Sequence, residues 1–499
     1  MLVLTDELLL NYIRCARRAY LNLYGDRSQA EPEKAFVQKL RRENQQQIFS
    51  VRQDHPTQVV RYPRGDWQTG YHNTLSLMEQ GVERIERGVL WLAPPWQLPD
   101  FSVVQSSNSS SSQLSQSTLV SRPTILVRCP EPSRWGNWSY YPVNIKLGKR
   151  PKTEYKLIAT FQAFLLTQIQ GCLPTDPLLL LREGKEHRVN CAHWQTQLWT
   201  TLMDCLAALA QSQAPDVFIS RQRCSLCSWQ TACQTVARET QHLSLVPGIT
   251  PSRYGALGEL GITELVQLAT VELPPEQLPE SLTPSVWQRL QQQARSLFHQ
   301  EPIPLPHAQP TIPQGPIELY FDLEAEPERQ VDFLFGVLCI NHVQQTEQFY
   351  ALVAQEPEQE FLIWQQFLAL VDRYPQAPIY HFSPYESDTL RRMSRRYGLA
   401  NRSIQSLLQR CVDIHALIVQ SATLPVESYS LKAIAQWLRF TWRDQGLSGD
   451  QTVCLYDEWL ESGDRTKLET IIRYNEDDCR ATYKLKAWLV EFWQSQTAG

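Results

Sequence analysis

The chain has 499 residues, too many for one ordinary hydrophobic core, so we expect two or three domains. Hydrophobic residues make up 42% and charged residues 20%, which is the composition of a soluble globular protein. The net charge of −5 excludes a general attraction for nucleic acid, so any such binding must come from local basic patches. The first residues have no basic segment followed by an apolar one, and no apolar run is long enough to span a membrane. We therefore expect a cytoplasmic protein without membrane attachment.

The first part of the chain has the pattern of an α/β domain. Residues 1–95 have mainly helical apolar spacing, and a Ser/Gln run at 105–117 is typical of a disordered loop inside the domain. Three segments predicted as strands and one predicted as a helix follow: strands 124–128, 140–146 and 177–182, and helix 155–170. We expect this domain to cover residues 1–240.

Four cysteines are placed as candidate ligands for a metal or a cluster. Cys224, Cys227 and Cys233 lie at short spacing, and Cys15 near the N-terminus is the candidate fourth ligand. One distant and three clustered cysteines, together with the opening helix at 5–21, resemble the iron–sulfur staple of RecB-like nucleases. That resemblance implies a restriction-endonuclease-type (PD-(D/E)xK) α/β fold and a [4Fe–4S] cluster. On ligand type alone, structural Zn²⁺ and free buried thiols stay open.

The catalytic residues of the RecB-like family are not retained. Asn144 stands where active members have an acid, two positions before the retained Lys146, and Thr124 stands where their metal-binding Asp would fall. Ile158 and Gln162 occupy the corresponding helix positions. Because neutral side chains cannot hold Mg²⁺ against water, we expect an inert nuclease fold kept for nucleic-acid binding or scaffolding. Lys146 is a candidate nucleic-acid contact.

Residues 241–300 form a candidate connector. The segment 243–265 resembles a helix-hairpin-helix, in which backbone N–H groups near Gly248 would face a phosphate. A plain helical hairpin that packs two domains together fits the same residues. The Pro-rich stretch 301–316 then has the composition of a stiff linker.

From residue 317 onward, strands alternate with helices, which predicts an α/β domain with a mixed sheet over 317–499. The segments predicted as strands are 317–324, 331–340, 345–352 and 377–382, and those predicted as helices are 357–373, 384–397, 428–439 and 465–494.

Four acids of this domain form a candidate two-metal site. Asp322 and Glu324 share one face of a strand, Glu386 follows another strand, and Asp478 lies four residues after Tyr474 on a helix. Carboxylates brought together in this way repel one another unless cations lie between them, so we expect two Mg²⁺ or Mn²⁺ ions. Tyr474 would orient the attacking water.

Other polar residues near these acids have weaker claims. Asp388 is the alternative middle ligand, and Asp477 is interpreted as a neighbour of Asp478 rather than a ligand. Asp413 has the position of a helix cap. Lys432 could contact a phosphate or be solvated.

The order Asp-x-Glu, middle acid and Tyr-x-x-x-Asp resembles the ribonuclease-H-like DEDD exonucleases, and the surrounding residues are similar to a bacterial subgroup, the YprB type. The resemblance covers about residues 315–495 and implies 3′–5′ hydrolysis of nucleic acid. DNA and RNA both stay open as the substrate, with DNA favoured. It departs from the general pattern at Glu386, where Asp is usual. The alternative is a non-catalytic nucleic-acid-binding scaffold in which both nuclease folds are inactive.

Overall fold

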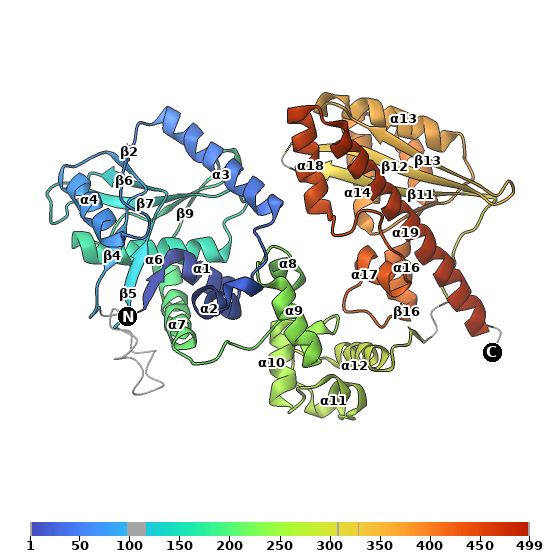
Figure 1. The fold of residues 1–499 in the computed structure, drawn as a ribbon, viewed down its shortest axis with the longest axis horizontal. Helices are drawn as coiled ribbons and strands as arrows, with labels where there is room; N and C mark the ends of the chain where they lie inside the picture. The colour runs from blue at the N-terminus through green and yellow to red at the C-terminus, as the bar shows by residue number, and fades with distance from the viewer. Residues whose placement is uncertain (1, 97–115, 307–308, 328, 498–499) are drawn as a thin grey trace. The chain divides into compact units, whose positions relative to one another are not determined.

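The computed structural model describes residues 2–96, 116–306, 309–327 and 329–497 (Figure 1). The chain divides into two compact units, residues 1–235 and 236–499. Of the predicted Ser/Gln loop at 105–117, residues 105–115 lie outside the part of the chain that the structure describes. None of the described helices combines the length and apolar character that crossing a membrane requires.

The first unit is built on two sheets. The larger has the strand order β2-β3-β6-β7-β8-β9, and the smaller has the order β1-β5-β4. The strands of the larger sheet are β2 Gln58–Val59, β3 Arg84–Glu86, β6 Ile125–Cys129, β7 Ser139–Ile145, β8 Leu178–Leu180 and β9 Glu186–Arg188. Those of the smaller sheet are β1 Val3–Thr5, β5 Thr118–Ser121 and β4 Leu90–Leu92.

Eight helices accompany these strands among the described residues: α1 Asp6–Arg14, α2 Ala16–Tyr24, α3 Ala35–Asp54, α4 Trp67–Glu79, α6 Thr153–Gln170, α7 Cys191–Leu209, α8 Arg221–Cys224 and α9 Gln230–Glu239. The mainly helical pattern of residues 1–95 thus also contains β1 to β4, which the sequence did not predict. Strands of two or three residues are too short to show an alternating pattern.

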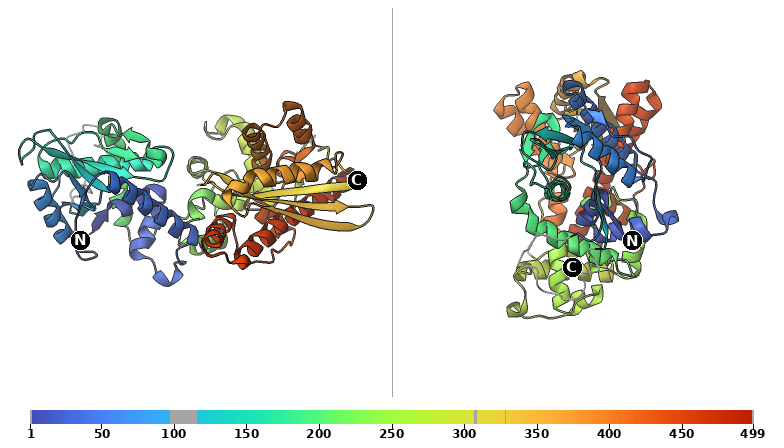
Figure 2. Two further views of the ribbon diagram at one scale, coloured as in Figure 1. Left: turned by 90° about the horizontal axis from the view of Figure 1, so that it is seen from above. Right: turned by 90° about the vertical axis from the view of Figure 1, so that its left-hand side faces the viewer.

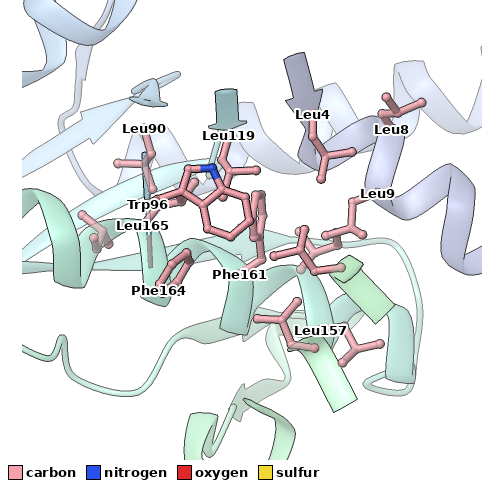
Figure 3. Close-up of a cluster of buried hydrophobic side chains, with 14 of the residues drawn as sticks. Leu4, Leu8, Leu9, Leu90, Trp96, Leu119, Leu157, Phe161, Phe164 and Leu165 are labelled. Atoms are coloured by element: carbon pink, nitrogen blue, oxygen red, sulfur yellow. The ribbon is translucent and has the colours of Figure 1, made fainter. Parts of the chain in front are cut away.

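Helix α6 is the central helix of the first unit. It connects β7 to the parallel strand β8, and it is buried on most sides because its sequence is apolar nearly all round. Phe161, Phe164 and Leu165 pack with Leu4 and Leu119, which come from the two parallel strands β1 and β5 (Figure 3). The core therefore lies between the smaller sheet and helix α6, which connects two strands of the larger sheet.

The second unit contains a five-stranded mixed sheet in the order β13-β12-β11-β14-β15. Strand β11 pairs antiparallel with β12 and parallel with β14. The strands are β11 Ile317–Glu326, β12 Val331–Asn341, β13 Thr346–Val353, β14 Ile379–His381 and β15 Cys411–Asp413. The first four lie where the sequence predicts strands, whereas β15 was not predicted.

Helices cover both faces of this sheet (Figure 2, left). They are α13 Glu360–Asp372, α14 Pro384–Tyr397, α15 Asn401–Arg410, α16 Ile414–Ser421, α17 Leu431–Trp437, α18 Gly449–Ser462 and α19 Arg465–Thr497. Alternate residues of β11 enter different cores: Phe321 packs against α13, and Tyr320 packs against α16 and α19. Helices α15, α16 and α18 were not predicted.

A helical connector in the second unit is hydrogen-bonded to residues that follow the sheet strands. It consists of α10 Pro251–Glu259, α11 Leu265–Thr270 and α12 Pro284–His299. On α12, Gln293 donates to the Leu424 carbonyl (2.7 Å) and accepts from the Tyr429 hydroxyl (2.9 Å). The Pro-rich stretch after α12 is also held at its start, because β10 (Ile303–Pro304) pairs with β16 (Ala422–Thr423).

Candidate functional site

Three carboxylates from distant parts of the second unit meet in one place. Asp322 and Glu324 project from the same face of β11, and Asp478 reaches them from α19. One oxygen of each carboxylate lies within 4.8 Å of the other two. Within the described ranges, no other group of three His, Cys, Asp or Glu ligand atoms lies so close together.

A close approach of α19 to the sheet brings these acids together. Nδ2 of Asn475, a buried residue of α19, donates a 2.7 Å hydrogen bond to Oδ2 of Asp322. Opposite Asp322 in the strand register lies Gly336 of β12, and a Cβ atom at that position would overlap Oδ1 of Asn475. The absence of a side chain at position 336 therefore leaves the space that the Asn475 amide occupies beside Asp322.

The other two acids have hydrogen-bond donors of their own. Thr452 of α18 donates from Oγ1 to Oε2 of Glu324 (2.7 Å), and Nε1 of Trp442 donates to Oδ1 of Asp478 (2.7 Å). The Tyr474 hydroxyl, one helical turn before Asp478, also hydrogen-bonds to that carboxylate. These bonds hold both carboxylates in fixed orientations.

The electrostatics of the cluster favour a bound cation. Burial, with repulsion from Asp478, raises the pKa of Glu324 to about 8. Burial also raises the pKa of Asp478 to about 7, although the hydrogen bond from Trp442 opposes this shift. The pKa of Asp322 is raised by burial and by the charges of Asp478 and Glu324. Ionising all three without a counter-charge is therefore costly, and a divalent cation among them would relieve that cost.

Lys432 is a cation within this site. Its ammonium group lies 4.8 Å from the ring centre of Tyr474 and 5.6 Å from that of Trp442, and it donates to the Leu447 carbonyl. Burial lowers the pKa of Lys432, and the charges of Asp478 and Glu324 oppose that effect. Of the two interpretations of Lys432, the structure favours a place beside the acids over full solvation.

Glu386 lies near the three acids but outside the group defined by the 4.8 Å limit. It is buried at the start of α14, where it accepts a hydrogen bond from Ser383 (3.2 Å) and lies 3.6 Å from Nδ1 of His381. Its charge contributes to the raised pKa of Asp322. Asp388 instead is exposed and pairs with Arg391 at 2.7 Å, so of the two middle candidates Glu386 is the one that faces the cluster.

Two further acids have structural partners. Asp477 accepts hydrogen bonds from the backbone N–H (2.8 Å) and Nε (2.9 Å) of Arg443, so it lies beside the cluster as a neighbour, as predicted. Asp413 caps α16 by accepting from the Ala416 N–H at 3.1 Å, which confirms its predicted role.

Sequence reasoning missed Asn475, Trp442 and Thr452 as contacts of the acids. Asn475 follows Tyr474 directly, so its place inside the Tyr-x-x-x-Asp motif was an available signal. Trp442 and Thr452 lie in segments without a recognisable pattern, and only the fold brings them to the site.

The four candidate cysteines gather in the first unit, from both of its ends. Cys15 separates α1 from α2, Cys224 ends α8, Cys233 lies on α9 and Cys227 lies between these two helices. They are close enough for their charges to influence one another, with Arg17 and Arg18 beside them. Burial raises the pKa of the Cys224, Cys227 and Cys233 thiols, and the arginines oppose this shift.

Within the described part of the chain, no three of these sulfurs lie within 4.8 Å of one another.

A neutral pair of side chains stands at the position in the first unit where the resemblance places an acid. Nδ2 of Asn144 donates to Oε1 of Gln162 (2.6 Å), Nε2 of Gln162 donates back (3.3 Å), and both residues are buried. Oγ1 of Thr124 accepts from the Ile145 N–H at 3.3 Å. Burial lowers the pKa of Lys146, and the charge of Asp6 opposes that shift. These residues offer no carboxylate at the positions where the resemblance placed acids.

Gly248 lies in the turn before α10, between α9 and α10 in the chain. Its φ of 94° is in the region that favours glycine, and its carbonyl accepts from Arg253 at 2.7 Å. The segment before it forms one 3₁₀ turn, Leu243–Leu245.

Residues 319–490 match the family model of the RNase H superfamily. The match covers the sheet of the second unit and all three acids that meet in the site. No curated protein matches the chain. The second unit therefore carries an RNase H-like domain, a nuclease-type fold whose members generally act on nucleic acid with divalent metals.

Proposed function

We propose that the chain is a metal-dependent nuclease that removes nucleotides from the 3′ end of nucleic acid, DNA rather than RNA, in its RNase H-like domain. The observation that carries the proposal is the meeting of Asp322, Glu324 and Asp478 within 4.8 Å of one another. The polarity rests on the resemblance to DEDD exonucleases, and the comparison of DNA with RNA below tests the preference for DNA.

The residues present fit Mg²⁺ or Mn²⁺, because the donors are carboxylate oxygens and their repulsion calls for positive charge. Asp322, Glu324 and Asp478 would hold two such ions, with Glu386 as the fourth acid. Bound there, the ions would lower the pKa of the attacking water and neutralise the leaving 3′ oxygen.

The surrounding residues have supporting roles in this proposal. The pKa of Tyr474 is raised by burial and by Asp478, so its hydroxyl keeps its proton and can orient the attacking water. Lys432 brings a positive charge to the side of Asp478 and Glu324, where it can contact the phosphate. Asn475, Thr452 and Trp442 hold the three carboxylates in place.

The first unit is proposed to be an inert RecB-like nuclease fold that binds nucleic acid. Its helix α6 crosses from β7 to the parallel strand β8, and the Asn144–Gln162 pair lies where that family has catalytic groups. The connector is proposed to contribute backbone N–H groups near Gly248 to a phosphate.

Cys15, Cys224, Cys227 and Cys233 are proposed to hold a [4Fe–4S] cluster. Measuring iron, acid-labile sulfide and zinc in anaerobically purified protein tests this assignment. Iron and sulfide should be present and should fall sharply in Cys227→Ser, but not in Cys172→Ser. Stoichiometric zinc without iron, or no metal at all, would contradict the cluster.

Degradation of 5′-labelled single-stranded DNA, and of the same sequence as RNA, tests the nuclease proposal. Mg²⁺ or Mn²⁺ should produce a ladder of shortened DNA that is absent with chelator and in Asp322→Ala and Asp478→Ala, whose circular dichroism should match the wild type. Asp388→Ala, which removes an exposed carboxylate, should keep full activity. Full activity in Asp322→Ala or Asp478→Ala would defeat the assignment, and DNA binding without cleavage would favour the scaffold function.

A further inference from the structure

A basic surface lies around the start of α6 in the first unit. We call it the lysine surface and define it as Lys146, Lys149, Arg150, Lys152, Lys156 and His187. It joins the end of β7, the loop that follows, the first turn of α6 and β9. Lys149, Arg150 and Lys152 are exposed. The surface concentrates positive charge in a protein whose net charge is −5.

Contacts among its members show that the surface is continuous. Lys146 and Lys152 both lie over the ring of Tyr155, at 5.6 and 5.9 Å from its centre. Lys156 lies 4.9 Å from the ring centre of Trp194, and its charge also lowers the pKa of His187, for which burial is the larger cause. Residues separated in sequence therefore form one patch.

Acids also lie next to the lysine surface. Asp6, whose charge opposes the lowering of the Lys146 pKa, accepts hydrogen bonds from the Ser121 hydroxyl (2.6 Å) and the Arg122 N–H (2.8 Å). Glu154 on α6 pairs with Arg14 at 3.4 Å, so a cation from α1 already offsets its charge. Glu183 lies 3.7 Å from Lys149, but both side chains are more than half exposed, and water screens such pairs strongly. An approaching polyanion can therefore displace Glu183 at little cost.

The aromatic rings of this region position cations rather than offer stacking faces. Tyr155 and Trp194 pack into a core with Leu179 and Leu181, and their rings are in contact with lysine ammonium groups. Each of these two half-buried rings is therefore already in contact with a cation and with the core. The lysine surface therefore presents ammonium and guanidinium groups, which contact the phosphates of a nucleic acid and not its bases.

The lysine surface also borders the neutral Asn144–Gln162 pair. Asn144 lies on β7, and Lys146 directly follows the last residue of that strand, where its N–H still donates to the Leu180 carbonyl (2.9 Å). The amide pair puts no negative charge beside the lysines. The first unit thus offers positive charge where a metal-dependent nuclease would place acids.

We infer that the lysine surface binds the phosphate backbone of a nucleic-acid strand without reading its bases. This inference rests on the proposed function, which gives the first unit a role in nucleic-acid binding, and it names the surface and the part of the strand involved. The surface needs no divalent metal and no residue of the RNase H-like domain, so it acts as a holding site separate from the cleaving site.

Fluorescence anisotropy with a labelled oligo-dT of about 30 nucleotides tests the inference. All proteins in the assay are full-length, contain Asp322→Asn and are measured in the presence of chelator, so that binding is observed without cleavage. The test variant adds Lys149→Glu, Arg150→Glu and Lys152→Glu. Because each neutralised phosphate of a single strand contributes about 0.7 to the salt slope, we expect the slope of log K against log salt to fall by about 2. Affinity near 0.1 M salt should drop at least tenfold.

A matched control changes the net charge by the same amount at scattered sites. Arg64→Glu, Arg402→Glu and Arg465→Glu alter three exposed arginines outside the lysine surface and outside the connector. This control should keep the wild-type slope and an affinity within about threefold of it. Equal weakening in both variants, or none in the test variant, would overturn the inference. So would binding of polyglutamate in place of the oligonucleotide, which would mark a surface for acidic proteins. Failure of DNA cleavage by the wild type would leave this result unaffected.

Discussion

Asn475 donates a hydrogen bond of 2.7 Å to Asp322, a residue 153 positions earlier in the chain. This bond joins the long helix α19 to strand β11 at the point where the candidate metal ligands meet. The Asn475 amide also fills the space above Gly336, so one side chain links the position of an acid to the packing of a helix on a sheet.

Gly336→Ala should disrupt the site without touching any acid. A methyl group at position 336 would overlap Oδ1 of Asn475, so the helix or the amide must move. Overpacking of this kind costs about 1–3 kcal/mol, and we expect the unfolding midpoint in urea to fall accordingly. Metal affinity measured by calorimetry should also fall, because Asp322 loses its orienting donor.

Gly255→Ala is the matched control for Gly336→Ala. Gly255 lies inside α10 with open space around its Cβ position, so alanine there should be neutral or stabilising by up to about 1 kcal/mol. Equal effects of the two substitutions would show that Gly336 has no special packing role.

The stability of the metal-free second unit should decrease as pH rises. The pKa of Glu324 is raised to about 8 and that of Asp478 to about 7, from ordinary values of 4.5 and 3.8. A carboxyl group with a raised pKa in the folded state stabilises the fold while it is protonated, and this contribution is lost as pH rises through the folded value. At about 1.4 kcal/mol per pKa unit, we expect a loss of a few kcal/mol between pH 5 and 8.5.

Denaturant titrations at several pH values, with chelator, check this dependence. Glu324→Gln should flatten the profile, and Mg²⁺ should restore stability at high pH because it supplies the missing counter-charge. Asp388→Asn, a change at an exposed carboxyl, should leave the wild-type profile. A profile that does not change with pH in the wild type would rule out ionisation of a buried cluster.

Neutralising Glu386 or Asp388 in turn should show which of the two is the middle metal ligand. Glu386 is buried and influences Asp322, whereas Asp388 is exposed and paired with Arg391. Under the nuclease proposal, Glu386→Gln should reduce kcat at least a hundredfold and weaken Mn²⁺ binding, while Asp388→Asn should change kcat less than twofold. The comparison requires kcat and calorimetric Mn²⁺ affinity for both variants, and a reversed order would make Asp388 the ligand.

Restoring an acid at position 144 should destabilise the first unit rather than revive a nuclease site. In Asn144→Asp, an oxygen would face Oε1 of Gln162 across 2.6 Å, and a buried charge would lose its donor. We expect a cost of about 2–4 kcal/mol in the free energy of unfolding. Asn190→Asp is the control, because Asn190 caps α7 and aspartate caps a helix equally well. Metal-dependent cleavage by Asn144→Asp in an Asp322→Ala background would contradict an inert first unit.

Much of the second unit could be predicted from its sequence, because β11 to β14 are long or apolar enough to show a pattern. Helix α14 was predicted over its full range, since Pro384 begins it and Gly398 ends it with a left-handed conformation. Helices α15, α16 and α18 were missed. In α16, which is apolar and only eight residues long, helix and strand patterns cannot be told apart.

The acids of the candidate site could be identified from the sequence, but the residues that donate hydrogen bonds to them could not. Asp322, Glu324 and Asp478 lie in short motifs whose spacing fixes which face they share. Trp442 and Thr452 reach those acids from a loop and from α18, and no local pattern encodes a contact across more than 30 residues. Such contacts depend on tertiary packing, which a single sequence does not show.

The clamp between α12 and residues 424–429 has a mechanical consequence. Gln293 holds both the Leu424 carbonyl and the Tyr429 hydroxyl, and Ser430 directly after them caps α17, the helix that carries Lys432. A displacement of the connector must therefore either break these bonds or pull on the start of α17. The position of α12 and the position of the helix that carries Lys432 are therefore linked through three consecutive contacts.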